Sequence, residues 1–162
     1  MADQILTQDY LKSIFTYEDG KLYWKITKGN NAKAGKLAGC INRYRLVRLN
    51  DKLYGVHVLI WAMHYGMPDT NIDHINMNEL DNRLENLRLA NKSQNGCNRP
   101  KQKNNSSGYK NVSWYKRYAK WKVALQIDKK TKTIGYFEEL ELADLVAQEA
   151  RDKYHCEYAR HF

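Results

Sequence analysis

Residues 72–95 read IDHINMNELDNRLENLRLANKSQN, and this stretch decides the fold that we expect. Two short runs, 72–75 and 87–89, are typical of strands, and a polar loop rich in Asn, Asp and Glu separates them. From Asn91 onward the chain can form a helix that ends near Pro100, with Asn91 or Ser93 as its N-cap. The sequence therefore predicts the order strand, loop, strand, helix.

Hydrophobic periodicity and turn residues predict the elements on either side. A hairpin turn is expected at Asn50-Asp51, and Gly66 closes the helix before the central stretch. The expected ranges are a helix over 7–15 with Thr7 as N-cap, a strand over 21–26, a hairpin over 43–56, a helix over 56–66, strands over 109–114, 121–127 and 133–137 joined by turns over 116–120 and 128–132, and a helix over 139–154 with Ala143, Ala147, Ala150 and Tyr154 on one stripe.

The charge of the chain predicts a polyanionic partner. Its 162 residues carry a formal net charge of +9, and the pI is about 9.4. Between residues 101 and 137, ten Lys or Arg residues stand against one acid, Asp128. Such a cluster is typical of a nucleic-acid-binding face, although a protein can also be basic without this partner.

Cysteine use and hydropathy indicate an intracellular protein. Cys40, Cys97 and Cys156 lie far apart and form no CxxC pair. This argues against a disulfide framework or a structural zinc site and agrees with a reducing cytoplasm. No apolar run approaches the ~20 residues that span a bilayer, and the N-terminus MADQILTQDY lacks a signal-peptide pattern. We expect a cytoplasmic protein with no membrane contact.

The polar residues of the central stretch suit metal-dependent hydrolysis of a phosphodiester. That reaction needs a base for the attacking water and a Lewis acid for the developing charge. His74 is the candidate base, and Asp73 and Asn95 offer hard oxygen ligands for Mg²⁺ or Mn²⁺. Neighbours on a strand point to opposite faces. His74 therefore reaches the site of Asp73 only if the strand ends or twists there, or if base and metal flank the scissile phosphate. Surface polar groups, turns and caps use the same residue types, so the pattern alone leaves both interpretations open.

The segment from 56 to 100 resembles the HNH endonuclease family, specifically its phage and intron-encoded homing type. The resemblance is carried by VH…W…G over 56–66, DHIN over 73–76, DNRLENLRLA over 81–90 and SQNGCN over 93–98. It implies the ββα-metal fold, which agrees with the order of elements above. By position it makes Asp73 and Asn95 metal ligands and His74 the general base. It also makes Asn86 the residue that holds the loop and orients the catalytic His. Oxygen ligands of this kind favour Mg²⁺ over Zn²⁺.

Residues 107–162 resemble the AP2 DNA-binding domain. The resemblance rests on SGYKNVSWYKRYAKWKVALQI (107–127), TIGYF (133–137) and KYHCEYARHF (153–162). In that family a three-stranded sheet packed on one helix contacts the major groove of DNA. By position it nominates as DNA-binding residues Lys110, Ser113, Trp114, Lys116, Arg117, Lys120, Lys122 and Gln126.

Together these patterns predict an α+β protein with an HNH nuclease domain over 1–100, whose ββα-metal core covers about 56–100. A basic linker over 101–108 and an AP2-like module over 109–162 follow. We expect a phage-encoded, homing-type endonuclease that depends on Mg²⁺ or Mn²⁺ and recognises a site in double-stranded DNA. We expect a monomer, with a dimer as the alternative, and one active site per chain predicts a nick in one strand. The other hypotheses are an inactive DNA-binding regulator with a nuclease-like fold and an RNA-binding protein.

Overall fold

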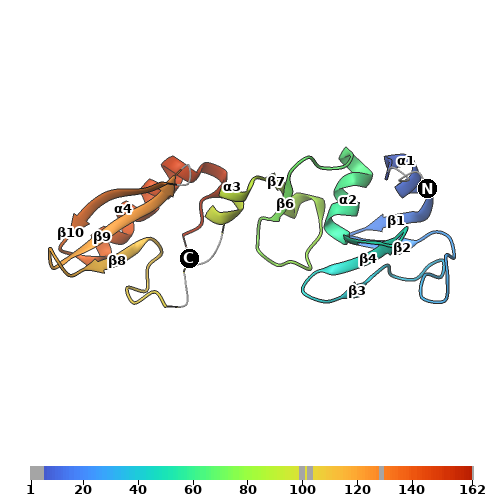
Figure 1. Ribbon diagram of the computed structural model, residues 1–162, viewed down its shortest axis with the longest axis horizontal. Coiled ribbons are helices and arrows are strands. Elements are labelled where there is room, and N and C mark those ends of the chain that lie inside the picture. Colours follow the sequence, from blue (N-terminus) through green and yellow to red (C-terminus); the bar gives the residue numbers. More distant parts are fainter. Residues whose placement is uncertain (1–5, 99–100, 102–103, 128–129, 162) are drawn as a thin grey trace. The chain divides into compact units, whose positions relative to one another are not determined.

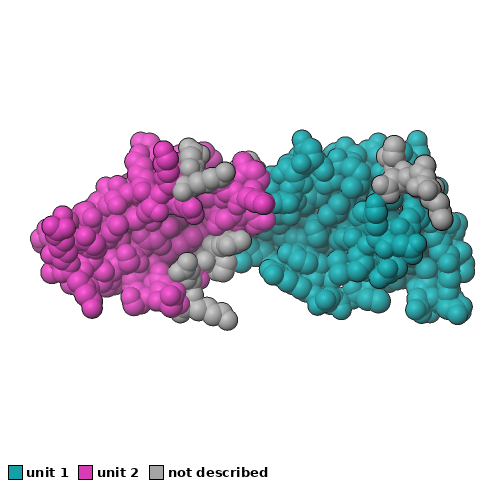
Figure 2. Space-filling model, viewed as in Figure 1, with its two compact units in different colours: residues 1–90 teal, residues 91–162 magenta. Residues whose placement is uncertain are grey.

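A computed structural model describes residues 6–98, 101, 104–127 and 130–161. The chain divides into two compact units, Met1–Ala90 and Asn91–Phe162, coloured teal and magenta in Figure 2. Each unit combines helices with antiparallel strands, so the predicted α+β class is confirmed. The domain limits at residue 100 and the linker over 101–108 stay predictions.

The first unit packs helices and short sheets around one another, as Figure 1 shows in blue to green. Its elements are α1 (Gln8–Ile14), β1 (Phe15–Glu18), β2 (Lys21–Trp24), β3 (Cys40–Ile41), β4 (Arg45–Leu49), β5 (Lys52–Gly55), α2 (Val56–Tyr65), β6 (Asn71–His74), the 3₁₀ turn η1 (Leu84–Asn86) and β7 (Leu87–Ala90). They form the sheets β1-β2, β3-β4-β5 and β6-β7. One hydrophobic core contains buried side chains from α1, α2 and all three of these sheets. Its buried side chains hold α2, the helix that precedes β6 in the chain, against the rest of the unit.

Most of the sequence-predicted boundaries in the first unit are confirmed. The Thr7 side chain caps α1 by accepting a hydrogen bond from a backbone N–H. Asn50 and Asp51 both have positive φ in the turn from β4 to β5. Helix α2 ends at Gly66, where φ of 91° suits glycine. The prediction was wrong at Phe15, which begins β1 instead of ending the helix, because its backbone pairs with β2.

Strands β6 and β7 have the predicted order of strand, polar loop and strand. They pair antiparallel, with Asp73 opposite Arg88 and His74 opposite Leu87. The predicted ranges, 72–75 and 87–89, differ from the observed ones by one residue at their ends. The 3₁₀ turn η1 was not predicted, and it brings the loop back into β7.

The second unit is a three-stranded sheet packed on a helix (Figure 1). Its elements are α3 (Lys92–Cys97), β8 (Val112–Tyr115), β9 (Lys120–Ile127), β10 (Lys130–Phe137), α4 (Leu140–His155) and the 3₁₀ turn η2 (Cys156–Tyr158). Strand β9 lies between β10 and β8. The predicted alanine stripe is confirmed, since Ala143, Ala147 and Ala150 are buried against the sheet residues Val123 and Leu125. Small side chains let α4 approach the sheet closely.

Two details of the second unit differ from the prediction. Asn91 caps α3 in a capping box with Gln94, so the alternative cap Ser93 is wrong. The helix ends at Cys97, and the predicted end near Pro100 lies outside the described residues. The predicted turn over 128–132 is shorter, because β10 already begins at Lys130, while residues 128–129 lie outside the described ranges.

Two predictions of exclusion concern the described part of the chain. None of its helices is both long and apolar enough to cross a bilayer. Cys40, Cys97 and Cys156 are free thiols in this structure.

Candidate functional site

Asp73 and His74 are the last two residues of β6, and both side chains are buried. The strand ends at His74, which meets one of the conditions under which neighbouring strand residues can serve one site. The chain turns there: the backbone N–H of Met77 donates to the His74 carbonyl at 3.0 Å, and the N–H of Ile75 donates to the Asn86 carbonyl at 2.9 Å. The end of β6 therefore carries a buried carboxylate and a buried imidazole at consecutive positions.

Asn82 fixes the imidazole of His74. The distance from His74 Nε2 to Asn82 Oδ1 is 2.8 Å, and Asn82 is only 2% exposed. Because the amide Oδ1 can only accept, Nε2 donates in this contact, and in the neutral form of such a ring Nδ1 is the nitrogen without a proton. This tautomer is the one that offers Nδ1 as a proton acceptor. The sequence analysis did not single out Asn82, since nothing distinguishes it from the other polar residues of the loop.

Asn86 holds the two ends of this loop together. Its side-chain amide donates to Asn76 Oδ1 at 3.0 Å and to the backbone carbonyl of Asp81 at 2.7 Å. Its Oδ1 accepts from the backbone N–H of Asn76 at 2.9 Å. Asn86 is 6% exposed, and these three bonds satisfy a polar group that would otherwise be costly to bury. They place the segment that carries Asn82 next to His74.

A salt bridge beside Asp81 closes the same loop at its surface. Arg83 donates to Asp81 through Nε at 2.9 Å and through Nη2 at 2.8 Å. This bond, with help from the Asn76 side chain, holds the pKa of Asp81 well below its usual value. Arg83 also forms a salt bridge with Glu85 at 3.3 Å, so the loop is stabilised by amide contacts inside and by ion pairs at its surface.

Arg88 is the partner of Asp73 across the β6–β7 ladder. Its Nε and Nη2 donate to Asp73 Oδ2 at 3.0 and 2.9 Å, and both side chains are largely buried. A buried carboxylate needs such a partner, because an isolated charge would lose its hydration without compensation. The sequence analysis missed Arg88. The antiparallel register that places it opposite Asp73 could have indicated it.

His57, at the start of α2, lies beside the candidate base. The ring centroids of His57 and His74 are 5.0 Å apart, in an edge-to-face arrangement. Burial lowers the pKa of His57 to about 4, and the nearby His74 adds to this shift. His57 is therefore neutral at neutral pH and packs with its ring against the ring of His74. A Cβ at Gly55 would lie 2.5 Å from this ring, so only glycine fits there.

The loop after β6 is also tied to the segment between β3 and β4. Arg43 and Tyr44 both bind the carboxylate of Glu79, through Nη2 at 2.6 Å and through the phenol at 3.0 Å. The bond from Arg43 is the main reason why the pKa of Glu79 is lowered. The Tyr44 ring lies 5.3 Å from that of His57 and 6.3 Å from that of His74. The contact with Glu79 therefore holds a second aromatic ring near the imidazole of His74.

The remaining candidate ligand, Asn95, lies on α3 in the second unit. Its backbone N–H donates to the Asn91 carbonyl within the helix at 2.9 Å, and its side chain is partly exposed. In the described part of the chain, no three side chains of His, Cys, Asp or Glu gather in a way that could hold an ion. A joint site of Asp73 and Asn95 stays a prediction.

Three of the nominated DNA-binding residues lie on the sheet face opposite α4. Ser113 pairs with Lys122 across β8 and β9, and Gln126 lies two alternations further along β9. The neighbouring Val123 and Leu125 are buried under α4, so the alternate residues face away from the helix. The predicted polar face of β9 therefore exists.

The other nominated residues take different positions. Trp114 is cross-strand partner of Trp121, and their rings are 4.9 Å apart. Lys116 and Arg117 are exposed in the turn before β9. Lys120 forms a salt bridge with Glu138 at 3.1 Å. Lys110 precedes β8, is 9% exposed, and donates from Nζ to the Cys97 carbonyl at 2.8 Å, so it is not on the outer face of the sheet.

An aromatic cluster that the sequence analysis missed lies at one end of the polar face. The rings of Tyr115, Tyr118 and Tyr136 are between 4.9 and 5.3 Å apart. Lys122 Nζ lies 5.7 Å from the centre of the Tyr115 ring, and Arg117 stands 5.8 Å from that of Tyr118. The face thus combines cations with partly exposed aromatic rings, a combination that suits contacts with nucleic acid.

Comparison with known proteins gives two matches. The model of the HNH endonuclease family matches residues 54–97, a range that contains β6, the loop, β7 and α3. Protein 3.8 of Escherichia phage T7 is 32% identical over 108 residues, which cover 64% of this chain and 87% of the phage protein. No solved structure matches the chain.

Proposed function

Because this chain belongs to the HNH endonuclease family, we propose that it is a metal-dependent endonuclease of the homing type that hydrolyses phosphodiester bonds at a recognised site in double-stranded DNA. The phage relative supports a phage origin, in which case the enzyme acts in the cytoplasm of the infected host. The observation that carries the proposal is the buried His74 at the end of β6, next to Asp73 and fixed by Asn82.

His74 is the general base of the proposed reaction. With Nε2 donating to Asn82, Nδ1 takes a proton from the water that attacks the scissile phosphate. Asn86 acts through the loop, because its three hydrogen bonds hold the segment that carries Asn82. Because the imidazole is held in one orientation, it does not have to change rotamer before it accepts a proton from the attacking water. Asn82 and Asn86 are thus positioning residues for His74.

The donor set suits a hard divalent ion. The buried Asp73 carboxylate and the Asn95 amide oxygen are ligands that favour Mg²⁺ or Mn²⁺ over Zn²⁺. When bound, such an ion supplies Lewis-acid charge for the phosphate and the leaving 3′ oxygen. Arg88 keeps the Asp73 carboxylate in a single orientation and balances its charge inside the protein.

The second unit supplies the contacts that select the site. Its polar face presents Ser113 and Lys122 as cross-strand neighbours of β8 and β9, and Gln126 further along β9. A narrow antiparallel sheet of this kind enters the major groove of DNA, ~12 Å wide, where lysines neutralise phosphates and amides contact base edges. Trp114, Lys116, Arg117 and Lys120 extend this surface around the turn. This assignment follows the resemblance to the AP2 domain.

Incubation of the purified protein with supercoiled plasmid and Mg²⁺ tests the proposal. We expect nicked circles before linear DNA, because one chain carries one active site. His74→Ala abolishes cutting, whereas the matched control His64→Ala, on α2 and outside the site, retains it. Sequencing the ends of the product gives the cut position in each strand and shows whether the cut is at one site.

Two results would contradict the enzyme assignment. A wild-type protein that binds duplex DNA tightly and leaves it intact with Mg²⁺ and Mn²⁺ would be an inactive DNA-binding protein with a nuclease-like fold. Equal cutting by wild type and His74→Ala would remove His74 from the mechanism. Preferential binding of RNA over duplex DNA would contradict the proposed substrate instead.

A further inference from the structure

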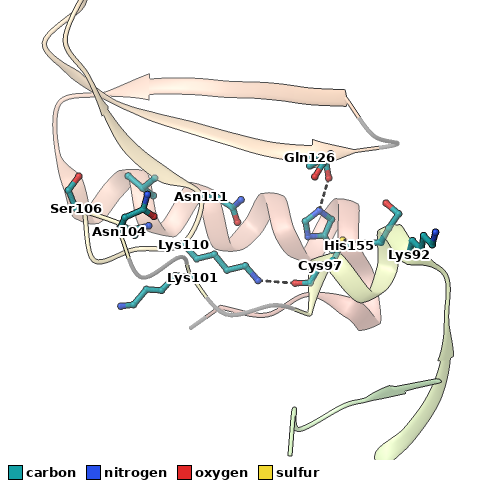
Figure 3. A pocket seen from close by; sticks show the side chains of 13 residues that line it. Lys92, Cys97, Lys101, Asn104, Ser106, Lys110, Asn111, Gln126 and His155 are labelled. Atoms are coloured by element: carbon teal, nitrogen blue, oxygen red, sulfur yellow. Dashed lines mark hydrogen bonds between the residues drawn. The ribbon is translucent and has the colours of Figure 1, made fainter. Parts of the chain in front are cut away.

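A polar cavity of about 760 Å³ opens within the second unit, between α3, the loop before β8 and the end of α4 (Figure 3). Lys92, Lys101 and Lys110 line it, and most of the other lining residues carry amide or hydroxyl side chains. No Asp or Glu belongs to the lining that the structure describes. The cavity therefore has several hydrogen-bond donors and a positive charge, which is the character of an anion-binding site.

Lys110 is the most unusual of these cations, because its side chain is buried to 9% exposure. In Figure 3 it reaches toward α3, and its Nζ donates to the Cys97 carbonyl at 2.8 Å. An ammonium group has three donors, so one carbonyl does not complete its hydrogen bonding. A buried lysine with this environment is costly for a protein that has no use for the charge.

Two of the charges that act on Lys110 are cations, and the Cys97 thiol acts against them. Burial lowers its pKa to about 8, and repulsion from Arg151 and Arg160 contributes to the same shift. Arg151 is fully buried, and its Nη1 donates to the Lys110 carbonyl at 2.7 Å, so this cation is fixed next to the lysine. Lys110 thus lines the cavity with other cations close to it, and an anion bound at its Nζ would relieve their repulsion.

We propose that this cavity binds a phosphate group and that the backbone of the DNA substrate supplies it. Lys110 is the inner donor, and Lys101 and Lys92 contact the same phosphate or its neighbour from the rim. The source of the phosphate rests on the proposed function, whereas the anion site itself rests on the cavity. The site would add a backbone contact to the second unit that is separate from the polar face of its sheet.

Binding of a fluorescent duplex, measured by anisotropy against salt concentration without divalent ions, tests the source of the phosphate. The double variant Lys110→Met/Lys101→Ala should reduce the slope of log K against log salt by about 1. The affinity of the double variant for DNA should fall by about tenfold, and this decrease should be the same for every DNA sequence. Lys21→Met, which removes one charge from β2 in the first unit, serves as the control and should change the slope less.

Titration with inorganic phosphate at constant ionic strength tests the anion site without DNA. Backbone amide resonances of residues 104–111 should shift in the wild type and stay in place in the double variant. Absence of these shifts in the wild type overturns the site, and an unchanged salt slope in the double variant overturns DNA as its source. A wild type that leaves plasmid intact while both effects appear contradicts the nuclease and supports the site. The single variants Lys92→Ala and Lys101→Ala repeat the test at the rim if the double variant does not fold.

Discussion

Replacing Asn82 with Leu tests whether the buried amide positions the catalytic base. Leu has the same number and branching of side-chain heavy atoms but accepts no hydrogen bond, so His74 Nε2 loses its partner at 2.8 Å in a buried site. A buried donor without an acceptor costs about 1–3 kcal/mol, and the ring is then free to change tautomer or orientation. If that loss falls on the chemical step, the rate decreases by about 10- to 100-fold. Substrate affinity should not change, since Asn82 is only 2% exposed and cannot reach DNA.

Single-turnover cleavage of plasmid with Mg²⁺, over a range of protein concentrations, separates the rate of the chemical step from DNA affinity. Asn71→Leu is the matched control, because it makes the same substitution at an exposed position of β6, the strand that carries His74. Thermal melting of each variant shows whether it is folded. A folded Asn82→Leu protein that cuts as fast as the wild type would refute the positioning role.

Asn82→Asp gives the pH dependence of the same contact. The carboxylate would accept from Nε2 as the amide does, and it would also stabilise the protonated imidazole. Since the base must be neutral to accept a proton, the acid limb of the pH–rate profile should move to higher pH. Cutting should be weak near pH 6 and recover toward pH 9. A profile that coincides with that of the wild type would show that residue 82 does not act on the base.

Three further substitutions test the supports around the site and the second core. Arg88→Met leaves Asp73 as an uncompensated buried charge, so we expect a loss of about 3–5 kcal/mol in urea unfolding and a partial recovery with Mg²⁺. Burial lowers the pKa of His57 to about 4 in the folded protein, below the ordinary value of 6.5. As the pH falls, His57 is therefore protonated in the unfolded chain before it is protonated in the folded protein. The free energy of unfolding should decrease by about 3 kcal/mol between pH 6.5 and pH 4. His57→Gln should flatten that fall, and parallel pH–stability curves would contradict it. Ala147→Leu overfills the contact between α4 and the sheet and should lower the stability of the second unit by about 1–3 kcal/mol in urea, while an unchanged midpoint would show that the contact is loose.

Local patterns predicted those parts of the fold that depend on neighbouring residues. Two short strands flanking a polar run gave β6 and β7, and Asn91 gave the start of α3 because its side chain caps the first helical turn. The Asn50-Asp51 turn followed from residues that tolerate positive φ. The prediction failed for Lys130, where polar residues were taken for a turn although they alternate on a strand at the edge of the sheet.

The supports of the candidate site depend on contacts that no local pattern contains. Arg88 binds Asp73 because the register of β6 and β7 places the two residues opposite each other, fifteen positions apart in sequence. Asn82 reaches His74 only because Asn86 ties the loop ends together. In the sequence, the loop is a run of polar residues of which any could have faced solvent. Which of the amide side chains in this loop becomes buried depends on how the loop folds.

The base and the candidate ligand are held by different kinds of interaction, although they are neighbours in the chain. His74 is fixed by a neutral amide within a loop of amide contacts, and such bonds are screened less by salt than an ion pair is. Asp73 is fixed by a guanidinium, and this bond weakens whenever another cation competes for the carboxylate. The arrangement allows the charge around the ligand to be rearranged without moving the base. Asp73 and His74 are consecutive residues at the end of one strand. They can take two different roles because different side chains hold each of them in place.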